Sequence, residues 1–207
     1  MTKTGLIRIA NTQIYVSIFT VICAFLVLLS DVSIYTFAVL LSAVLHEAGH
    51  ILALSFCGEK PKKICIYPFG VDMKCCLSGL SYKKELFVLL SGSATNIIIC
   101  LLSLIICIFA YSRMALFIVF CNAFLGLANL IPVNGLDGGR ALYAFLCMKN
   151  ESEEKVYNLC RRVSNISYAV MSIFFVTVIF LTRANFSMII MLSLFAMGAV
   201  IASHVLK

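Results

Sequence analysis

Six long apolar stretches alternate with shorter polar segments along the chain. They cover residues 13–30, 34–57, 86–111, 114–132, 165–182 and 186–206. Each is long enough for a helix of about 20 residues, the length that crosses the hydrocarbon core of a bilayer. We therefore expect an all-α polytopic membrane protein with six transmembrane helices.

The composition excludes a soluble globular protein. Of the 207 residues, 62% are hydrophobic and only 12% are charged, whereas soluble domains are about a quarter charged. Six spans leave no room for an appended soluble module, so residues 1–207 are expected to form one membrane-embedded domain. The first apolar stretch is followed by no small-residue cleavage site and is interpreted as a retained anchor. Five of the ten cysteines lie inside apolar runs, where thiols behave as small hydrophobes: Cys23, Cys100, Cys107, Cys121 and Cys147.

The distribution of basic residues predicts the orientation of the spans. The net charge is +7, and fourteen of the sixteen basic residues would lie on one side of the membrane if all six spans form. Under the positive-inside rule, that side is the cytoplasm, and it holds both termini and the long loops 58–85 and 133–164. We interpret the charge as membrane topology and expect no nucleic-acid partner.

The second apolar stretch contains His46, Glu47 and His50, which form an H-E-x-x-H motif inside a predicted membrane helix. Ionisable residues are costly there and usually mark function. The i, i+4 spacing places both imidazoles on one helical face, where they are able to bind one zinc ion beside Glu47 as general base. The alternative is a polar contact between helices. His204, alone near the end of the last stretch, is expected at the membrane interface.

A catalytic zinc ion needs a third protein ligand, and Asp137 is the main candidate. It follows the fourth stretch in NLIPVNGLDGGRAL, where proline and glycines break the helix and allow irregular backbone at membrane depth. The orientation above places Asp137 and the H-E-x-x-H motif toward the same, cytoplasmic side. The alternative is that Asp137 caps a helix that begins at Gly138.

The two motifs together, H-E-x-x-H and N-x-x-P-x-x-x-L-D-G-G, resemble those of the site-2 protease family of intramembrane zinc metalloproteases. Between them, LSGSATN (Gly92 and Asn96) looks like that family's small-residue motif, and ICIYPFG resembles its short membrane-associated β-hairpin after the second span. The pattern is most similar to the sporulation branch, the stage IV sporulation protein FB type. It departs from the family at Ser93 and Gly135, where prolines are usual, and no CBS or PDZ domain is expected.

The resemblance implies one Zn²⁺ per chain, held by His46, His50 and Asp137, with Glu47 as the catalytic base. It also implies a substrate-binding or site-orienting role for five further residues. For Asn129, an interhelical hydrogen bond is the alternative role. The five residues are Asn129, Asn96, Pro68, Phe69 and Gly70.

The expected activity is hydrolysis of a peptide bond in or near the membrane segment of a membrane-tethered regulatory protein, such as a pro-sigma or anti-sigma factor. The expected location is a bacterial cell membrane, with the lipid bilayer and inhibitory membrane proteins as further partners. Residues 64–71 are β-prone and are expected either to offer an edge strand to the substrate or to form a membrane-surface loop. A non-proteolytic zinc-binding membrane protein and a zinc transporter are the alternatives. A prenyl-type peptidase is disfavoured, because its usual downstream glutamate ligand has no counterpart within a membrane span of this chain.

Overall fold

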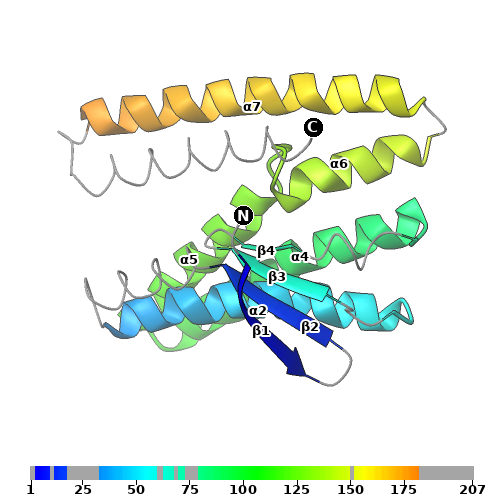
Figure 1. Ribbon diagram of the computed structural model, residues 1–207. Helices are drawn as coiled ribbons and strands as arrows, with labels where there is room; N and C mark the ends of the chain where they lie inside the picture. The colour runs from blue at the N-terminus through cyan, green and yellow to red at the C-terminus, as the bar shows by residue number, and fades with distance from the viewer. Residues whose placement is uncertain are drawn as a thin grey trace. The chain divides into compact units, whose positions relative to one another are not determined.

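The computed structural model describes residues 3–9, 12–17, 33–59, 63–67, 70–72, 79–149 and 152–181 (Figure 1). The chain forms two compact units, Met1–Ala128 and Asn129–Lys207. The described part is mostly helical. The first unit holds strands β1 to β4 and helices α2, α4 and nearly all of α5, and the second holds α6 and α7.

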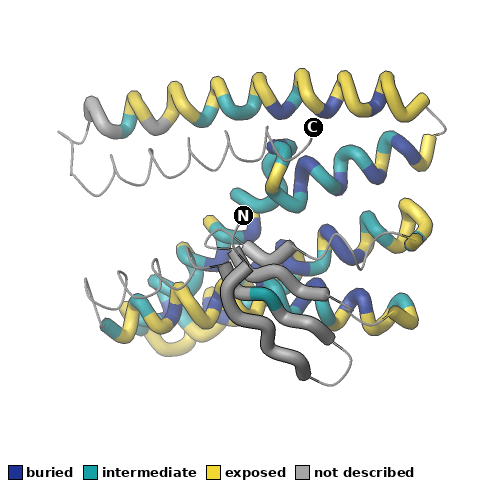
Figure 2. Tube along the Cα trace, viewed as in Figure 1, coloured by how far each residue is buried: buried dark blue, intermediate teal, exposed yellow. Residues whose placement is uncertain are grey.

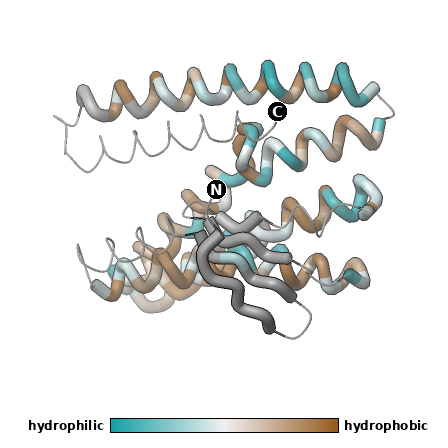
Figure 3. The backbone as a smooth tube through the Cα atoms, in the orientation of Figure 1, coloured by the Kyte–Doolittle hydropathy of each residue, from teal (hydrophilic) through white to brown (hydrophobic). Residues whose placement is uncertain are grey.

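Among the described residues of the first unit there are three apolar helices: α2 (Ile34–Phe56), α4 (Tyr82–Phe109) and α5 (Arg113–Asn129). Helix α2 begins after Ser33, whose hydroxyl accepts a hydrogen bond from the Thr36 backbone N–H at 3.3 Å, as an N-cap does. At its other end, Lys84 of α4 donates to the Cys57 carbonyl at 3.2 Å. Within the described ranges, α2 and α4 are long and apolar enough to cross a bilayer, and α5 is a shorter apolar helix (Figure 3).

Most of the buried residues of α2 and α4 are small or polar, with Leu54, Val88 and Leu89 as the larger exceptions, whereas many of their large apolar residues are exposed. On α4, the buried residues include Gly92, Ser93, Asn96 and Ser103, while Leu101, Leu102, Ile105, Ile106 and Phe109 are exposed (Figure 2). A soluble helix shows the opposite distribution. Helices in lipid bring small residues together at their contacts and leave large apolar residues facing the hydrocarbon. The packing therefore agrees with helices that lie in a membrane.

A four-stranded sheet in the order β1-β2-β3-β4 corrects the all-α expectation. Its strands are β1 (Lys3–Ile9), β2 (Thr12–Ser17), β3 (Lys63–Tyr67) and β4 (Gly70–Asp72). The pairs β1–β2 and β3–β4 are antiparallel, whereas β2 and β3 pair in parallel, with Gln13 opposite Lys63 and Val16 opposite Ile66. Membrane association of the β3–β4 pair stays a prediction.

The predicted first span, 13–30, is wrong at its beginning, because residues 13–17 belong to β2. The consecutive β-branched and aromatic residues Ile14, Tyr15 and Val16 favour a strand, and pairing with β1 and β3 satisfies their backbone groups. The rest of that span and the predicted sixth span, 186–206, lie outside the described residues. Six spans therefore stay a prediction.

The second unit contains α6 (Asp137–Cys147) and α7 (Glu153–Leu181). Helix α7 begins well before the predicted fifth span at residue 165, because good helix formers such as Glu153, Glu154 and Lys155 extend it. Its buried Val156 and Cys160 pack with Cys147 of α6. Burial raises the pKa of the Cys160 thiol, and the neighbouring Cys147 adds to this. The two cysteines are free and fill the core as small hydrophobes.

Candidate metal centre on helix α2

The two histidines of the H-E-x-x-H motif lie on the buried face of α2. His46 is 6% exposed and His50 is 3% exposed, and Ser42, Gly49 and Ala53 lie on the same face. Because α2 packs against α4, this face directs both imidazoles toward the backbone and side chains of that helix. The predicted helical spacing of the two residues is thus realised in the structure.

Helix α4 supplies a hydrogen-bond acceptor to the Nδ1 atom of each histidine. His46 Nδ1 lies 3.1 Å from the Asn96 side-chain oxygen, and His50 Nδ1 lies 2.7 Å from the Val88 carbonyl oxygen. A carbonyl oxygen only accepts, so each Nδ1 carries the proton and donates it. The Ser91 hydroxyl donates to the same Val88 carbonyl at 2.6 Å. Both rings are therefore held in the tautomer that leaves Nε2 with a lone pair.

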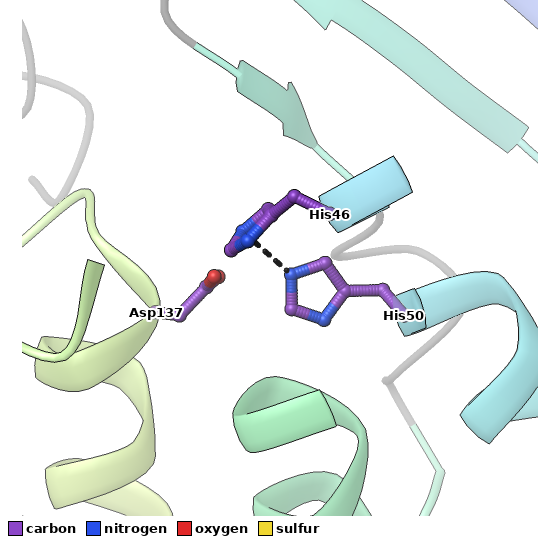
Figure 4. A group of neighbouring side chains, drawn as sticks. All are labelled: His46, His50 and Asp137. Carbon is purple, nitrogen blue, oxygen red and sulfur yellow. Dashed lines mark hydrogen bonds between the residues drawn. The ribbon is translucent and has the colours of Figure 1, made fainter. Parts of the chain in front are cut away.

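The two Nε2 atoms face each other at 3.2 Å, and the rings are nearly perpendicular at 87° (Figure 4). A hydrogen bond between them would require one ring to carry protons on both nitrogens, since both Nδ1 atoms already donate. A shared cation satisfies both lone pairs without that extra proton. Zinc–nitrogen bonds of about 2.05 Å at a tetrahedral angle place two ligand nitrogens about 3.3 Å apart. The observed separation fits this arrangement.

Gly92 gives the imidazoles the space they occupy. A Cβ atom at this position would overlap His50 Nε2 and would lie 2.8 Å from His46 Cε1. Since both rings are fixed through Nδ1, neither moves aside without breaking a hydrogen bond. The small residue in LSGSATN is therefore explained by the direct contact of the α4 backbone with the two rings.

A second buried polar contact lies one turn before His46. Asn122 of α5, which is fully buried, donates from Nδ2 to the Ser42 hydroxyl oxygen at 3.0 Å and to the Ile118 carbonyl oxygen. Ser42 in turn donates to the Ala38 carbonyl at 2.8 Å. Sequence reasoning missed this contact, although an amide in an apolar helix is a signal that it exists.

Asp137 belongs to the second unit and is the first residue of α6 (Figure 4). It is half-buried, and the N-cap of this helix is Leu136. The alternative in which Asp137 caps a helix that begins at Gly138 is therefore wrong. Cβ atoms at Gly138 and Gly139 would overlap the backbone of Leu130 and Val133, so the two glycines allow the first turn of α6 to rest on the preceding loop.

For the remaining predicted site residues, the structure gives the element and, for some, the burial. Glu47 is half-buried on α2, and Asn129 is the half-buried last residue of α5. Gly70 begins β4, whereas Pro68 and Phe69 lie outside the described residues. Among the predicted residues of the first unit, the structure brings together His46, His50 and Asn96.

Comparisons with known proteins agree with this architecture. Residues 109–178 match peptidase family M50. None of the curated proteins compared matches the chain. Among solved structures, the chain is similar to a site-2 protease from Methanocaldococcus jannaschii, with 24% sequence identity, a TM-score of 0.66, and coverage of 98% of this chain and 95% of that one. The chain therefore has the fold of a site-2 protease.

Proposed function

We propose that the chain is an intramembrane zinc metalloendopeptidase. The convergence of two Nε2 lone pairs at 3.2 Å on the buried face of the apolar helix α2 carries this proposal. The match of residues 109–178 to a peptidase family and the site-2 protease fold support the reaction class. The substrate is a membrane-tethered regulatory protein, such as a pro-sigma or anti-sigma factor, cleaved in or near its membrane segment.

The residues that would hold the zinc ion are His46, His50 and Asp137. Two imidazoles and one carboxylate are a donor set that suits catalytic zinc and leaves a fourth position open. When bound, zinc acidifies water and polarises the scissile carbonyl. Both imidazoles are buried, and Asn96 and the Val88 carbonyl maintain the orientation of the rings.

Glu47 is the general base. Its carboxylate takes a proton from the attacking water as the oxygen of that water bonds to the scissile carbonyl carbon. The same carboxylate then gives this proton to the leaving amide nitrogen as the carbon–nitrogen bond breaks. Water is consumed, one carboxyl and one amine are released, and Glu47 returns to its initial state.

Strand addition at β4 presents the substrate in an extended form. The β-prone segment expected to offer the edge includes Ile66, but Ile66 lies in β3, which pairs with β2 on one side and β4 on the other. Within the described residues, β4 is the edge strand on this side. Tyr67 and Gly70 flank a two-residue connection and are therefore expected to form a hydrogen-bonded pair. Hydrogen-bonded and non-hydrogen-bonded pairs alternate along antiparallel strands, so the Val71 N–H is expected to point away from β3.

The edge proposal is tested with Val71→Pro, which removes that outward N–H and preserves the β3–β4 ladder. Cleavage is expected to fall with zinc content unchanged. Ile66→Pro serves as the comparison, because it breaks the β2–β3 pairing and disturbs the whole sheet. Full cleavage by Val71→Pro would contradict strand addition at β4.

For the location, topology and partners of the protein, we retain the expectations from the sequence. We propose a bacterial cell membrane, six spans, both termini in the cytoplasm, and a site that opens to that side. Inhibitory membrane partners and membership of the sporulation branch belong to the same proposal. Asn129 would hold the substrate or orient the site.

The first experiment measures zinc per chain in the detergent-purified protein. We expect about one zinc ion in the parent, and loss both in Asp137→Ala and in the double variant His46→Ala, His50→Ala. Zinc retained fully by Asp137→Ala would show that the third ligand is wrong. A parent that binds no zinc after reconstitution would contradict the metalloprotease proposal.

The second experiment tests the peptidase reaction in cells. Glu47→Gln is expected to retain zinc and to lose cleavage by a factor of about 10² to 10⁴. New protein termini are compared in membranes from cells that express the parent or Glu47→Gln. Termini at membrane segments that appear only with the parent would identify substrates. Zinc uptake by proteoliposomes that is equal in both proteins, without new termini, would favour a transporter instead.

A further inference from the structure

Two side chains of α7 bind both backbone groups of a single residue in the loop before α6. The Asn134 N–H donates to the Ser164 hydroxyl oxygen at 2.8 Å, and the Tyr168 hydroxyl donates to the Asn134 carbonyl oxygen at 3.0 Å. Ser164 is 1% exposed, and Tyr168 is half-buried. They are four residues apart and therefore share one face of α7. We call this pair of hydrogen bonds the Asn134 clamp.

The clamp acts on a loop that has little regular structure of its own. The Leu136 N–H donates to the Val133 carbonyl at 3.0 Å, and Gly135 has φ of 103°, which closes a tight turn. Val133 is buried, and Pro132 has no N–H to donate. Without α7, both backbone groups of Asn134 would lack these partners, and the loop would keep the Leu136–Val133 and Val133–Ile131 backbone hydrogen bonds.

Asp137 follows Asn134 by three residues, so the clamp fixes the chain just before this carboxylate. On the other side of Asp137, Gly138 and Gly139 pack directly on the backbone of Leu130 and Val133. The position of Asp137 is therefore set from both sides. Of the two constraints, the glycine contacts act within the segment itself, whereas the clamp depends on α7.

We propose that Ser164 and Tyr168 are positioning residues that hold the Asp137 carboxylate where it completes the zinc site. This inference rests on the proposed function, in which Asp137 is the third ligand. Groups that orient metal ligands without binding the metal themselves contribute about 10- to 100-fold to metal affinity. Loss of either hydroxyl should therefore weaken zinc binding although neither side chain touches the metal.

A purely structural role would make a different prediction. In that case the clamp would only attach α7 to the loop, and its loss would lower stability without a change in the metal site. Zinc affinity and the visible spectrum of the Co²⁺-substituted protein separate the two roles. The spectrum reports the geometry of the ligands, which a change in overall stability does not alter.

The experiment compares Tyr168→Phe and Ser164→Ala with the parent, using the full chain in detergent. Thr177→Val is the matched control, because the Thr177 hydroxyl lies exposed on the same helix and donates only to the Ile173 carbonyl at 2.8 Å. Asp137→Ala gives the effect of complete loss of the ligand. Zinc affinity is measured by chelator competition, and hydrogen exchange is followed over residues 130–140 of the zinc-free protein.

We expect tenfold or greater loss of zinc affinity in Tyr168→Phe and Ser164→Ala, an altered Co²⁺ spectrum, and faster exchange over residues 130–140. Thr177→Val should behave as the parent. If Asp137→Ala loses zinc while both clamp variants bind it like the parent, the inference is overturned and the proposed function stands. If Asp137→Ala itself retains zinc, the third ligand is wrong and the positioning role falls with it.

Discussion

Each histidine of α2 donates its Nδ1–H to a different kind of acceptor. For His50 the acceptor is the Val88 backbone carbonyl, which no substitution removes. For His46 it is the Asn96 side chain, which is fully buried. A replaceable side chain therefore helps to orient His46, and we propose that Asn96 is a positioning residue for the metal site.

Asn96→Leu should weaken zinc binding by about 10- to 100-fold, because His46 loses the acceptor that fixes its tautomer. Asn96→Asp keeps an acceptor oxygen and should retain zinc. Chelator competition measures both affinities. Asn122→Leu is the matched control, since it removes another fully buried amide that bonds Ser42 and no histidine. Equal zinc affinities for Asn96→Leu and Asn122→Leu would refute the positioning role.

Gly92→Ala should abolish stoichiometric zinc binding although alanine is the better helix former by about 1 kcal/mol. The added methyl group would occupy the space of both imidazoles. Elemental analysis of the purified variant gives the answer. Ala94→Val, which adds bulk at an exposed position of the same helix, should bind zinc as the parent does. A Gly92→Ala protein with one zinc ion would show that the rings have more freedom than the geometry implies.

At the scale of elements, the start of α6 depends on contact between two backbones. Gly138→Ala would bring a methyl group against the backbone around Leu130, which has no rotamer to change. We expect destabilisation of about 1–3 kcal/mol, as for other overpacked sites, measured by thermal inactivation in detergent. Gly126→Ala is the comparison, because its nearest contacts, 3.3–3.4 Å away, include the Asn96 and Ile97 side chains. A similar loss in both would contradict this explanation.

Several elements could be predicted from the sequence, and others could not, for physical reasons. Apolar length identified α2, α4 and α5, because a continuous hydrophobic stretch favours a helix in lipid. The same criterion misassigned residues 13–17, since a short strand that runs into an apolar stretch resembles the start of a helix. Helix α7 began earlier than predicted, because apolar length marks a span and gives no helix boundary.

The candidate site was predicted in part. The H-E-x-x-H spacing fixed the two imidazoles on one face, because local helix geometry determines it. The Val88 carbonyl and the Asn134 clamp were not predictable, since a backbone acceptor has no sequence signature, and Ser164 and Tyr168 meet Asn134 only through tertiary packing. Asn96 was named as a site residue from resemblance alone, and its contact with His46 supplies the physical reason.

At the scale of the whole molecule, the sheet offers a direct test of the fold. Gln13 of β2 and Lys63 of β3 are paired positions, so cysteines placed there in a background without native cysteines should form a disulfide on mild oxidation. Gln13→Cys combined with Asp72→Cys should not, because β3 lies between β2 and β4. Mobility on a non-reducing gel reports the result. Cross-linking in the second pair alone would contradict the strand order.

The parallel pairing of β2 with β3 also limits the number of membrane crossings between these two strands. Neighbouring strands of one sheet exchange backbone hydrogen bonds, so they cannot lie on opposite faces of a bilayer. The chain between Ser17 and Lys63 is therefore expected to cross the membrane an even number of times, and α2 is long and apolar enough for one such crossing. A tag placed before Lys3 and one placed in the loop after β4 should consequently be accessible from the same side of the membrane.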